Sequence, residues 1–353
     1  MAEWIQRSGP KTKFRYERED GRPVRDARTL ERIRGLVIPP AWRDVHIAAS
    51  PRAEVQAWGL DVKGRKQYRY HPRAVERGQL RKYYRVREMA KELPQLRWRI
   101  RQDAASRTPT RTAVAAAVVR LISESFFRIG SERYVTENKT FGIASLQKRH
   151  VKVEQNHAVF SYVGKRSIKQ RQFVANRELA RLIARQLESP GTRLFRYKSG
   201  NTWSNLTSQD VNAYLHDTLC VPYTAKDFRT WGGTLRAATI LAELGAAKTD
   251  TEARRNVATV MRLVASELGN TPAICRKSYV HPMVVARYVD EGETIALSRK
   301  RGAGKDAYAH SPEERALIRF LDRHFPERRR RARDLRLPMK KAGPSLRAGR
   351  RIT

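Results

Sequence analysis

The stretch 269–282 constrains local structure more tightly than any other part of the chain. Thr271 is a good N-cap residue and Pro272 suits the first helical position, so a short helix is predicted to begin here. The helix should stop before the proline that follows His281, because the residue preceding a proline disfavours the helical conformation. Tyr279 therefore lies at the end of about two helical turns.

The neighbours of Tyr279 are predicted to have structural roles. Ile274 and Val280 are apolar and should anchor the short helix to a core, which leaves the phenol free to point into a cleft. Cys275 lies one turn before Tyr279 and is interpreted as a bystander, and His281 as a turn residue and not an acid. A tyrosine at a helix end is usually a packing residue, so a catalytic interpretation depends on the rest of the chain.

The chain as a whole is strongly basic. Its 353 residues include 73 Lys and Arg against 35 Asp and Glu, a formal net charge of +38. Such a charge repels itself in the folded state, so a polyanionic partner is expected. Nucleic acid is favoured over a membrane, because the sequence has no run of about 18 apolar residues and no signal peptide. Cys220 and Cys275 lack metal-like spacing, which predicts a reducing compartment, no zinc and a cytoplasmic protein.

Residues 1–78 are predicted to form a small β-rich domain. Asp20-Gly21 is a turn signal between short alternating segments, which indicates a hairpin formed by 13–17 and 24–25. A brief helix is expected at 26–34, and strands at 42–47, 55–58 and 67–70.

The last of these strands has two alternative interpretations. Its period of two places Tyr68 and Tyr70 on one face, with Gln67 and Arg69 on the other. Two aromatic residues on one strand face usually belong to a core. Beside Lys63, Arg65 and Lys66 they are also suited to contact the sugars, phosphates or base edges of DNA.

Residues 79–325 are predicted to form a larger, mainly helical domain with a short antiparallel β-meander, so the fold class is α+β. Gly78 and a charged helix at 79–91, closed by Leu93-Pro94, should connect the two domains. Further helices are expected at 110–127, 176–187, 208–219, 224–244, 251–268 and 311–324, and strands at 148–153, 158–163 and 167–174. The segment 326–353 has 11 Lys and Arg against 2 Asp and Glu, and is predicted to be a flexible tail that adds nonspecific DNA affinity.

Three basic residues occupy unusual positions in this domain. Arg128 interrupts an apolar run, where burial is costly without an anion or a carboxylate partner. Lys165 lies at a hairpin tip, from which a long cationic side chain can reach into a groove. Arg229 lies in the second turn of a helix beside Gly232-Gly233, and the paired glycines indicate close approach of another element or of a ligand.

The sequences that surround these residues resemble the type IB DNA topoisomerase family, chiefly its compact poxvirus and bacterial branch. The matching motifs are FFRIG around Arg128, VGK around Lys165, KDFRTWG around Arg229 and TPAICRKSY ending at Tyr279. GRKQYRY in the first domain resembles the DNA-contacting strand of the family, and the resemblance covers about residues 30–290 in the same order. It implies catalytic roles for Tyr279 as nucleophile, Lys165 as general acid, Lys226 as an auxiliary, and Arg128, Arg229 and Asn270, with DNA contacts by Arg65, Lys66, Gln67, Tyr68, Tyr70, Arg133 and Tyr134.

Two positions depart from the family pattern. Nuclear and poxvirus members carry His where this chain has Asn270, whereas bacterial members often carry Asn. An amide donates a hydrogen bond to a phosphate oxygen but delivers no proton at neutral pH, so Asn270 is assigned to orientation and charge stabilisation. Arg166 replaces an Asp of the poxvirus enzymes, so the role of that Asp is not transferred.

The residue types also suit the chemistry without the family. In-line attack on a phosphodiester builds negative charge on its nonbridging oxygens, which two guanidiniums and an amide can hold without a metal. A free tyrosine has a pKa of about 10, and cationic neighbours favour an ionised phenol. A protonated Lys165 can neutralise the strongly basic 5′-alkoxide that leaves. Because the phosphotyrosyl link conserves the bond energy, no ATP, obligatory metal or small-molecule cofactor is expected.

The resemblance further implies a monomer that acts as a clamp on double-stranded DNA of the nucleoid. Two alternative functions remain open. A site-specific tyrosine recombinase shares much of the catalytic set, but it usually has His where this chain has Lys226 and a helical first domain. A noncatalytic basic DNA-binding protein would account for the charge alone.

Overall fold

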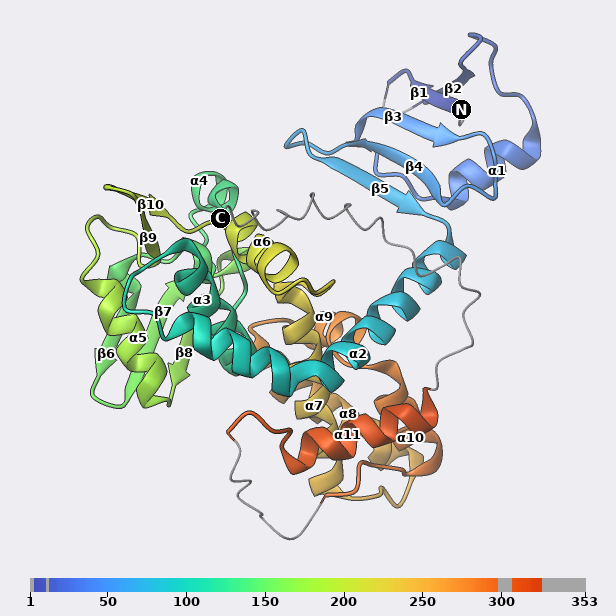
Figure 1. The fold of residues 1–353 in the computed structure, drawn as a ribbon. Helices are drawn as coiled ribbons and strands as arrows, with labels where there is room; N and C mark the ends of the chain where they lie inside the picture. The colour runs from blue at the N-terminus through green and yellow to red at the C-terminus, as the bar shows by residue number, and fades with distance from the viewer. Residues whose placement is uncertain (1–2, 11–12, 298–306, 326–353) are drawn as a thin grey trace, which may run out of the picture. The chain divides into compact units, whose positions relative to one another are not determined.

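The computed structural model describes residues 3–10, 13–297 and 307–325. The chain divides into two compact units, Met1–Tyr83 and Tyr84–Thr353, which have the α+β composition that the sequence predicts (Figure 1). The division falls inside helix α2 (Pro72–Ala104), a few residues after the boundary expected at residue 78. The predicted basic tail, 326–353, lies outside the described residues.

Within its described residues, the first unit contains an antiparallel sheet with the strand order β2-β1-β3-β4-β5. One face of this sheet packs against helix α1 (Ala27–Gly35), which has Asp26 as its N-cap. Ile33 of this helix is buried with Ile5, Ile47 and Ala57 in the core between helix and sheet. The strands are β1 (Trp4–Ser8), β2 (Arg15–Arg18), β3 (Arg43–Ala48), β4 (Val55–Leu60) and β5 (Lys66–Tyr70).

The predicted hairpin around Asp20-Gly21 is only partly correct. Strand β2 meets the following segment in a single bridge, between Glu17 and Pro23. Its full partner is β1, which the sequence reading missed. The longer pairing prevails because Ile5 of β1 enters the core, at 1% exposure.

Helix α2 does not end at Leu93-Pro94 as predicted, and Pro94 lies inside it. A proline in a helix cannot donate to the carbonyl four residues earlier. Here that carbonyl, on Ala90, accepts a hydrogen bond from Nε2 of His310 at 2.6 Å. Leu93 and Leu96 on either side are buried, so their packing keeps the helix continuous.

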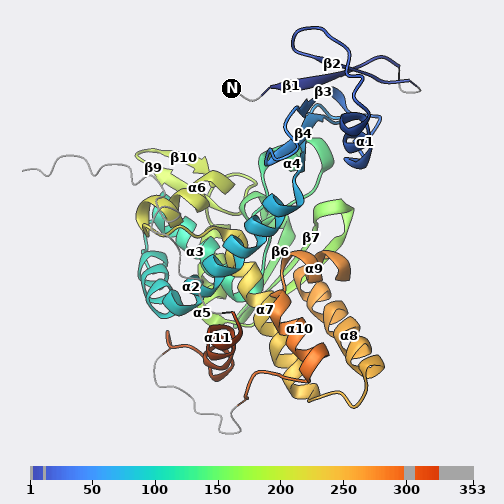
Figure 2. The same cartoon turned by 90° about the vertical axis from the view of Figure 1, so that its right-hand side faces the viewer.

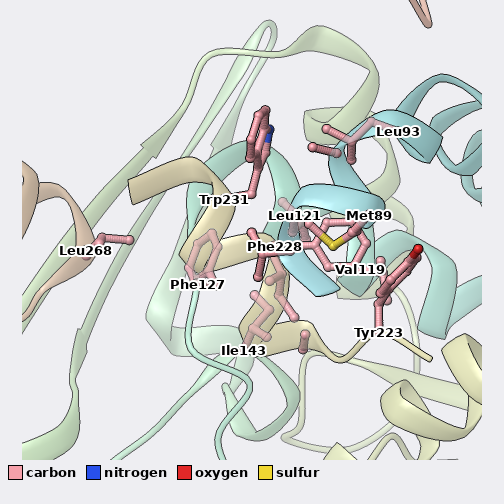
Figure 3. Close-up of a cluster of buried hydrophobic side chains, with 14 of the residues drawn as sticks. Met89, Leu93, Val119, Leu121, Phe127, Ile143, Tyr223, Phe228, Trp231 and Leu268 are labelled. Atoms are coloured by element: carbon pink, nitrogen blue, oxygen red, sulfur yellow. The ribbon is translucent and has the colours of Figure 1, made fainter. Parts of the chain in front are cut away.

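The second unit is organised around helix α3 (Arg111–Ser125), in which every residue from Ala113 to Ile122 is buried. Figure 3 shows Met89 and Leu93 of α2, Val119 and Leu121 of α3, and Phe228 and Trp231 of α7 in one cluster. Helix α8 packs along α7, and α9 and α10 pack against α8 (Figure 2). The remaining helices are α4 (Glu132–Asn138), α5 (Arg177–Leu187), α6 (Ser208–Ala213), α7 (Ala225–Leu244), α8 (Asp250–Leu268), α9 (Pro272–Ser278), α10 (Pro282–Glu291) and α11 (Pro312–His324).

The predicted meander is present as β6-β7-β8, formed by β6 (Val151–Glu154), β7 (His157–Val163) and β8 (Lys169–Val174). The chain at 148–150 forms a 3₁₀ turn and not the start of a strand. Helix α6 is shorter than expected, because a π turn at Tyr214–Thr218 follows it. The sequence reading missed α4, α10 and the hairpin of β9 (Arg196–Ser199) and β10 (Thr202–Asn205). Across the described residues, every helix is too short or too polar to cross a bilayer.

Candidate active site

The segment after α3 directs Arg128 toward the end of α8. Phe126 caps α3 with a left-handed backbone, at φ 56°, and Phe127 turns into the core at 0% exposure. The guanidinium of Arg128 donates through Nη2 to the carbonyl of Gly269 and to Oδ1 of Asn270, the latter at 2.5 Å. Burial lowers the pKa of Arg128, and the nearby Tyr279 acts in the opposite direction.

Asn270 is thus held by Arg128. With its oxygen engaged, its Nδ2 is buried and has no hydrogen-bond partner among the described residues. A buried amide donor without a partner is unfavourable unless a bound group supplies an acceptor for it. A phosphate oxygen is an acceptor of the required kind.

Helix α7 carries Arg229 and Lys226 near its N-terminus. Arg229 is 3% exposed and donates through Nη2 to the carbonyl of Leu268 at 2.9 Å. Its Nε is buried without a hydrogen-bond partner in the described part of the chain. Burial lowers the pKa of Arg229, and Tyr279 acts to raise it. Lys226 is exposed.

The first turn of α7 is fixed by Asp227, the carboxylate of the KDFRTWG motif, which forms a capping box with Thr224. Asp227 accepts from the backbone and hydroxyl of Thr224, both at 2.9 Å. It also accepts two bonds from Arg85 of α2, at 2.8 and 3.1 Å. The Asp227 side chain is 1% exposed. Arg85 and Thr224 together therefore hold the turn from which Lys226 and Arg229 project.

Tyr279 follows α9 directly, as the capping pattern predicts. The Cζ of Arg229 lies 5.2 Å from the centroid of the Tyr279 ring, and the Tyr279 carbonyl accepts from Oγ1 of Thr234 at 3.2 Å. Val280 is buried as expected.

The prediction that Ile274 anchors the helix is wrong, because Ile274 is 37% exposed whereas Cys275 is buried at 0% exposure. The cause is rotation of the helix by one residue relative to the expected face. Burial raises the pKa of the Cys275 thiol to about 11, which suits an unreactive packing residue. His281 caps α10, its Nδ1 accepting from the backbone of Met283 at 3.2 Å.

One cavity of about 400 Å³ is lined by side chains from the segment after α3, from α7 and from the residue that follows α9. Lys165 reaches it from a 3₁₀ turn between β7 and β8 and is exposed. Asn270 lies beside the cavity through its bond to Arg128 and does not line it. Arg133 is turned aside to Glu137, at 2.6 Å. The predicted site residues that line the cavity are Arg128, Tyr134, Lys165, Lys226, Arg229 and Tyr279.

Several lining residues of this cavity were missed by the sequence reading, among them two on α6. Ser208 and Asn212 of α6 line it, and Asn212 accepts from the backbone of Ala225 at 3.5 Å. Their spacing of four residues places them on one helix face, which was the available signal. A polar pair on an amphipathic helix is too common to single out without the fold.

In the first unit, the two tyrosines of β5 are exposed, so the core interpretation is wrong. Tyr68 is 42% and Tyr70 50% exposed, and their rings stack with centroids 5.7 Å apart. Lys66 lies on the same face, its Nζ 3.6 Å from the Trp58 ring. Arg65 and Gln67 instead bond to Asp61, at 2.8 and 3.0 Å.

Comparison with known proteins identifies the family. Residues 72–302 match the model of the eukaryotic DNA topoisomerase I catalytic core, and residues 13–61 match the model of the bacterial DNA topoisomerase IB N-terminal domain. DNA topoisomerase 1B of Acanthamoeba polyphaga mimivirus is 29% identical over 301 residues, which cover 83% of this chain and 90% of that protein. With a catalytic-core match across most of its length and an N-terminal match before it, the chain belongs to the type IB DNA topoisomerases.

Proposed function

We propose that this topoisomerase relaxes supercoiled duplex DNA through a transient 3′-phosphotyrosyl intermediate, without ATP or an obligatory metal. The observation that carries the proposal is the cavity in which Tyr279 lies with Arg128, Arg229, Lys226 and Lys165. In the first step, the Tyr279 oxygen attacks the phosphorus in line and the bond to the 5′ oxygen breaks. The broken strand swivels, and the 5′ hydroxyl then attacks the phosphotyrosine to reseal it.

Stabilisation of the negative charge that develops on the nonbridging phosphate oxygens is assigned to Arg128, Arg229 and Asn270. Arg128 uses its Nη2 to hold Gly269 and Asn270, and Arg229 uses its Nη2 to hold Leu268. The other nitrogens of both guanidiniums are left for phosphate. The unpartnered donors, Nε of Arg229 and Nδ2 of Asn270, would gain acceptors on binding. Donors that are already oriented need no reorganisation during the reaction.

Lys165 is assigned as the general acid that protonates the leaving 5′ oxygen, and it takes the proton back during religation. Its exposed position on a turn between strands allows its ammonium to enter the cavity when DNA is bound. Lys226 is assigned as an auxiliary cation. We place the reaction on nucleoid DNA in the cytoplasm, carried out by a single chain.

The proposal is tested with supercoiled plasmid in EDTA without ATP. Relaxation should proceed, and detergent should trap protein on the 3′ end of the cut strand, as read from strands labelled separately at each end. A dependence on ATP or a divalent ion, or protein on the 5′ end, would overturn this mechanism. Recombinant products without net relaxation would indicate a recombinase.

Replacing Arg85 with glutamine should slow strand cleavage about 10- to 100-fold, because the turn that carries Lys226 and Arg229 loses its bidentate support. The buried Asp227 would also lose two charge-assisted bonds, so stability should fall by about 2 kcal/mol. The rate is measured under single-turnover conditions at saturating DNA, and stability by thermal unfolding.

The control for Arg85→Gln is Arg97→Gln. Arg97 makes a similar bidentate pair with the buried Glu314, at 2.6 and 3.0 Å, and does not line the active-site cavity. This variant should lose comparable stability and keep its cleavage rate within about threefold. Equal loss of rate in the two variants would show that Arg85 acts only through general stability.

The exposed face of β5 is proposed to bind DNA through Lys66, Tyr68 and Tyr70. Replacing Lys66 with glutamine should reduce the slope of log affinity against log salt by about 0.9, the value for one phosphate contact. Replacing Tyr70 with alanine should weaken binding without changing the slope, since the ring carries no charge. Noncleavable duplex is titrated at several salt concentrations, and an unchanged slope for the lysine variant would contradict the phosphate contact.

A further inference from the structure

A second cavity, of about 690 Å³, lies in the same unit as the active site and shares two of its walls. On α7, Ala225, Lys226 and Arg229 line the active-site cavity, whereas Phe228, Trp231, Gly232 and Leu235 line the second one. These two sets occupy different faces of the helix. Phe126 lines the second cavity and Arg128, two residues later, lines the first.

The shared wall is packed closely. A Cβ atom placed on Gly232 would lie 1.9 Å from Cε1 of the Phe126 ring, so the ring rests directly on the α7 backbone. The wall of the second cavity therefore includes Phe228, which precedes Arg229, and Phe126, which lies two residues before Arg128.

Arg120 lines this cavity and has one side-chain nitrogen without a hydrogen-bond partner in the part of the chain that the structure describes. The residue is 8% exposed; its Nε donates to Glu124 at 2.7 Å and its Nη2 to Glu178 at 3.0 Å. The third nitrogen, Nη1, is buried and has no hydrogen-bond partner within the described ranges. A buried guanidinium nitrogen in this state favours an acceptor.

The carboxylates of the cavity are already occupied by other donors. Glu124 also accepts from Asn176 at 3.0 Å, and Glu178 accepts two bonds from Arg101, at 2.5 and 3.0 Å. Arg177 lines the cavity and is exposed, and it forms no ion pair with any carboxylate that the structure describes. The lining has four arginines against three glutamates, a net charge of +1.

The walls are aromatic as well as basic. Phe126, Phe228, Trp231 and Tyr308 line the cavity, and Cζ of Arg101 lies 5.4 Å from the Tyr308 ring centroid. We infer that this cavity binds a small aromatic monocarboxylate, with its carboxylate between Arg120 and Arg177 and its ring against the aromatic wall. A dianion such as phosphate fits less well, because the three glutamates repel the second charge.

The test uses benzoate as the probe, measured by calorimetry and by ligand-observed NMR on the full chain without DNA. Benzoate should bind, and benzamide, of the same shape without charge, should bind at least about tenfold more weakly. Replacing Arg177 with glutamine should weaken benzoate about tenfold or more. The control is Arg181→Gln, since Arg181 is exposed one turn later on α5 and does not line the cavity.

Two further arms make the result decisive. Ser123→Leu should abolish binding by filling the cavity, which Ser123 lines. Arg120→Lys retains the charge and removes the unpaired nitrogen, so it should also weaken benzoate binding. Thermal unfolding reports whether this variant of a buried residue folds. If it does not fold, the test rests on the exposed Arg177. Equal binding of benzoate and benzamide, tighter binding of phosphate, or no effect of Arg177→Gln would overturn the inference. Because these assays contain no DNA, their outcome is independent of the proposed cleavage mechanism.

Discussion

Replacing Tyr279 with phenylalanine is expected to abolish relaxation of supercoiled plasmid, with a loss of at least about 10⁴-fold in cleavage rate. The change removes one oxygen, and with it the only step by which the proposed covalent intermediate forms. Losing a nucleophile removes the whole reaction path, which is why such losses exceed those for a single stabilising contact. The ring still fits beside Arg229, whose Cζ lies 5.2 Å from the ring centroid. DNA binding should therefore persist.

The control for this variant is Tyr134→Phe. Tyr134 also lines the active-site cavity and is 44% exposed, so it is the alternative phenol within reach. Its variant should retain the covalent adduct and relax plasmid within about tenfold of the wild-type rate. Plasmid relaxation and detergent-trapped adduct are measured for both proteins. Adduct formation by the Tyr279 variant would contradict the assignment of Tyr279, and loss of the adduct in the Tyr134 variant as well would identify Tyr134 as the nucleophile.

Replacing Arg229 with lysine is expected to slow cleavage by about 10²–10³-fold, the usual cost of one preorganised donor to a developing oxyanion. Lysine keeps the positive charge but lacks the planar fork that bonds to two partners at once. Here one partner is the Leu268 carbonyl, at 2.9 Å, and the proposed second is a phosphate oxygen. Single-turnover cleavage and religation are measured at saturating DNA, so that weaker binding does not contribute.

Arg236→Lys is the matched control for Arg229→Lys. Arg236 lies on the same helix and pairs with Glu267 of α8 at 2.8 Å, but its side chain is 45% exposed. Surface pairs of this kind contribute little to stability, so cleavage should change by less than about threefold. A similar loss in both variants would mean that Arg229 acts by joining α7 to α8 and not on the phosphate.

Five helix starts were predictable from the sequence because their causes are local, whereas α2 begins at Pro72 and not at residue 79 as expected. Asp26, Thr110, Thr224, Thr271 and Ser311 each precede a helix as its N-cap, and a cap needs only residues three positions apart. The meander and the β4–β5 strands were predictable for a similar reason, since alternation and turn residues are read within one short segment.

The errors arose where a distant residue changed the local preference. Pro94 does not end α2, because His310 satisfies the carbonyl that proline leaves free. Strand β1 was missed because its role depends on pairing with both β2 and β3. Tyr68 and Tyr70 are exposed because the opposite face of their sheet packs on α1.

The sequence by itself determined the family, the capped helices and the residue types suited to phosphodiester chemistry, because each of these is written in short motifs. Only the tertiary structure decided that side chains from α7, from the turn before β8 and from the segments after α3 and α9 line one cavity. It also decided that Arg128 holds Asn270 beside this cavity and that Arg85 supports Asp227 from another helix. Contacts between residues more than a hundred positions apart depend on how whole elements pack, which no local pattern encodes.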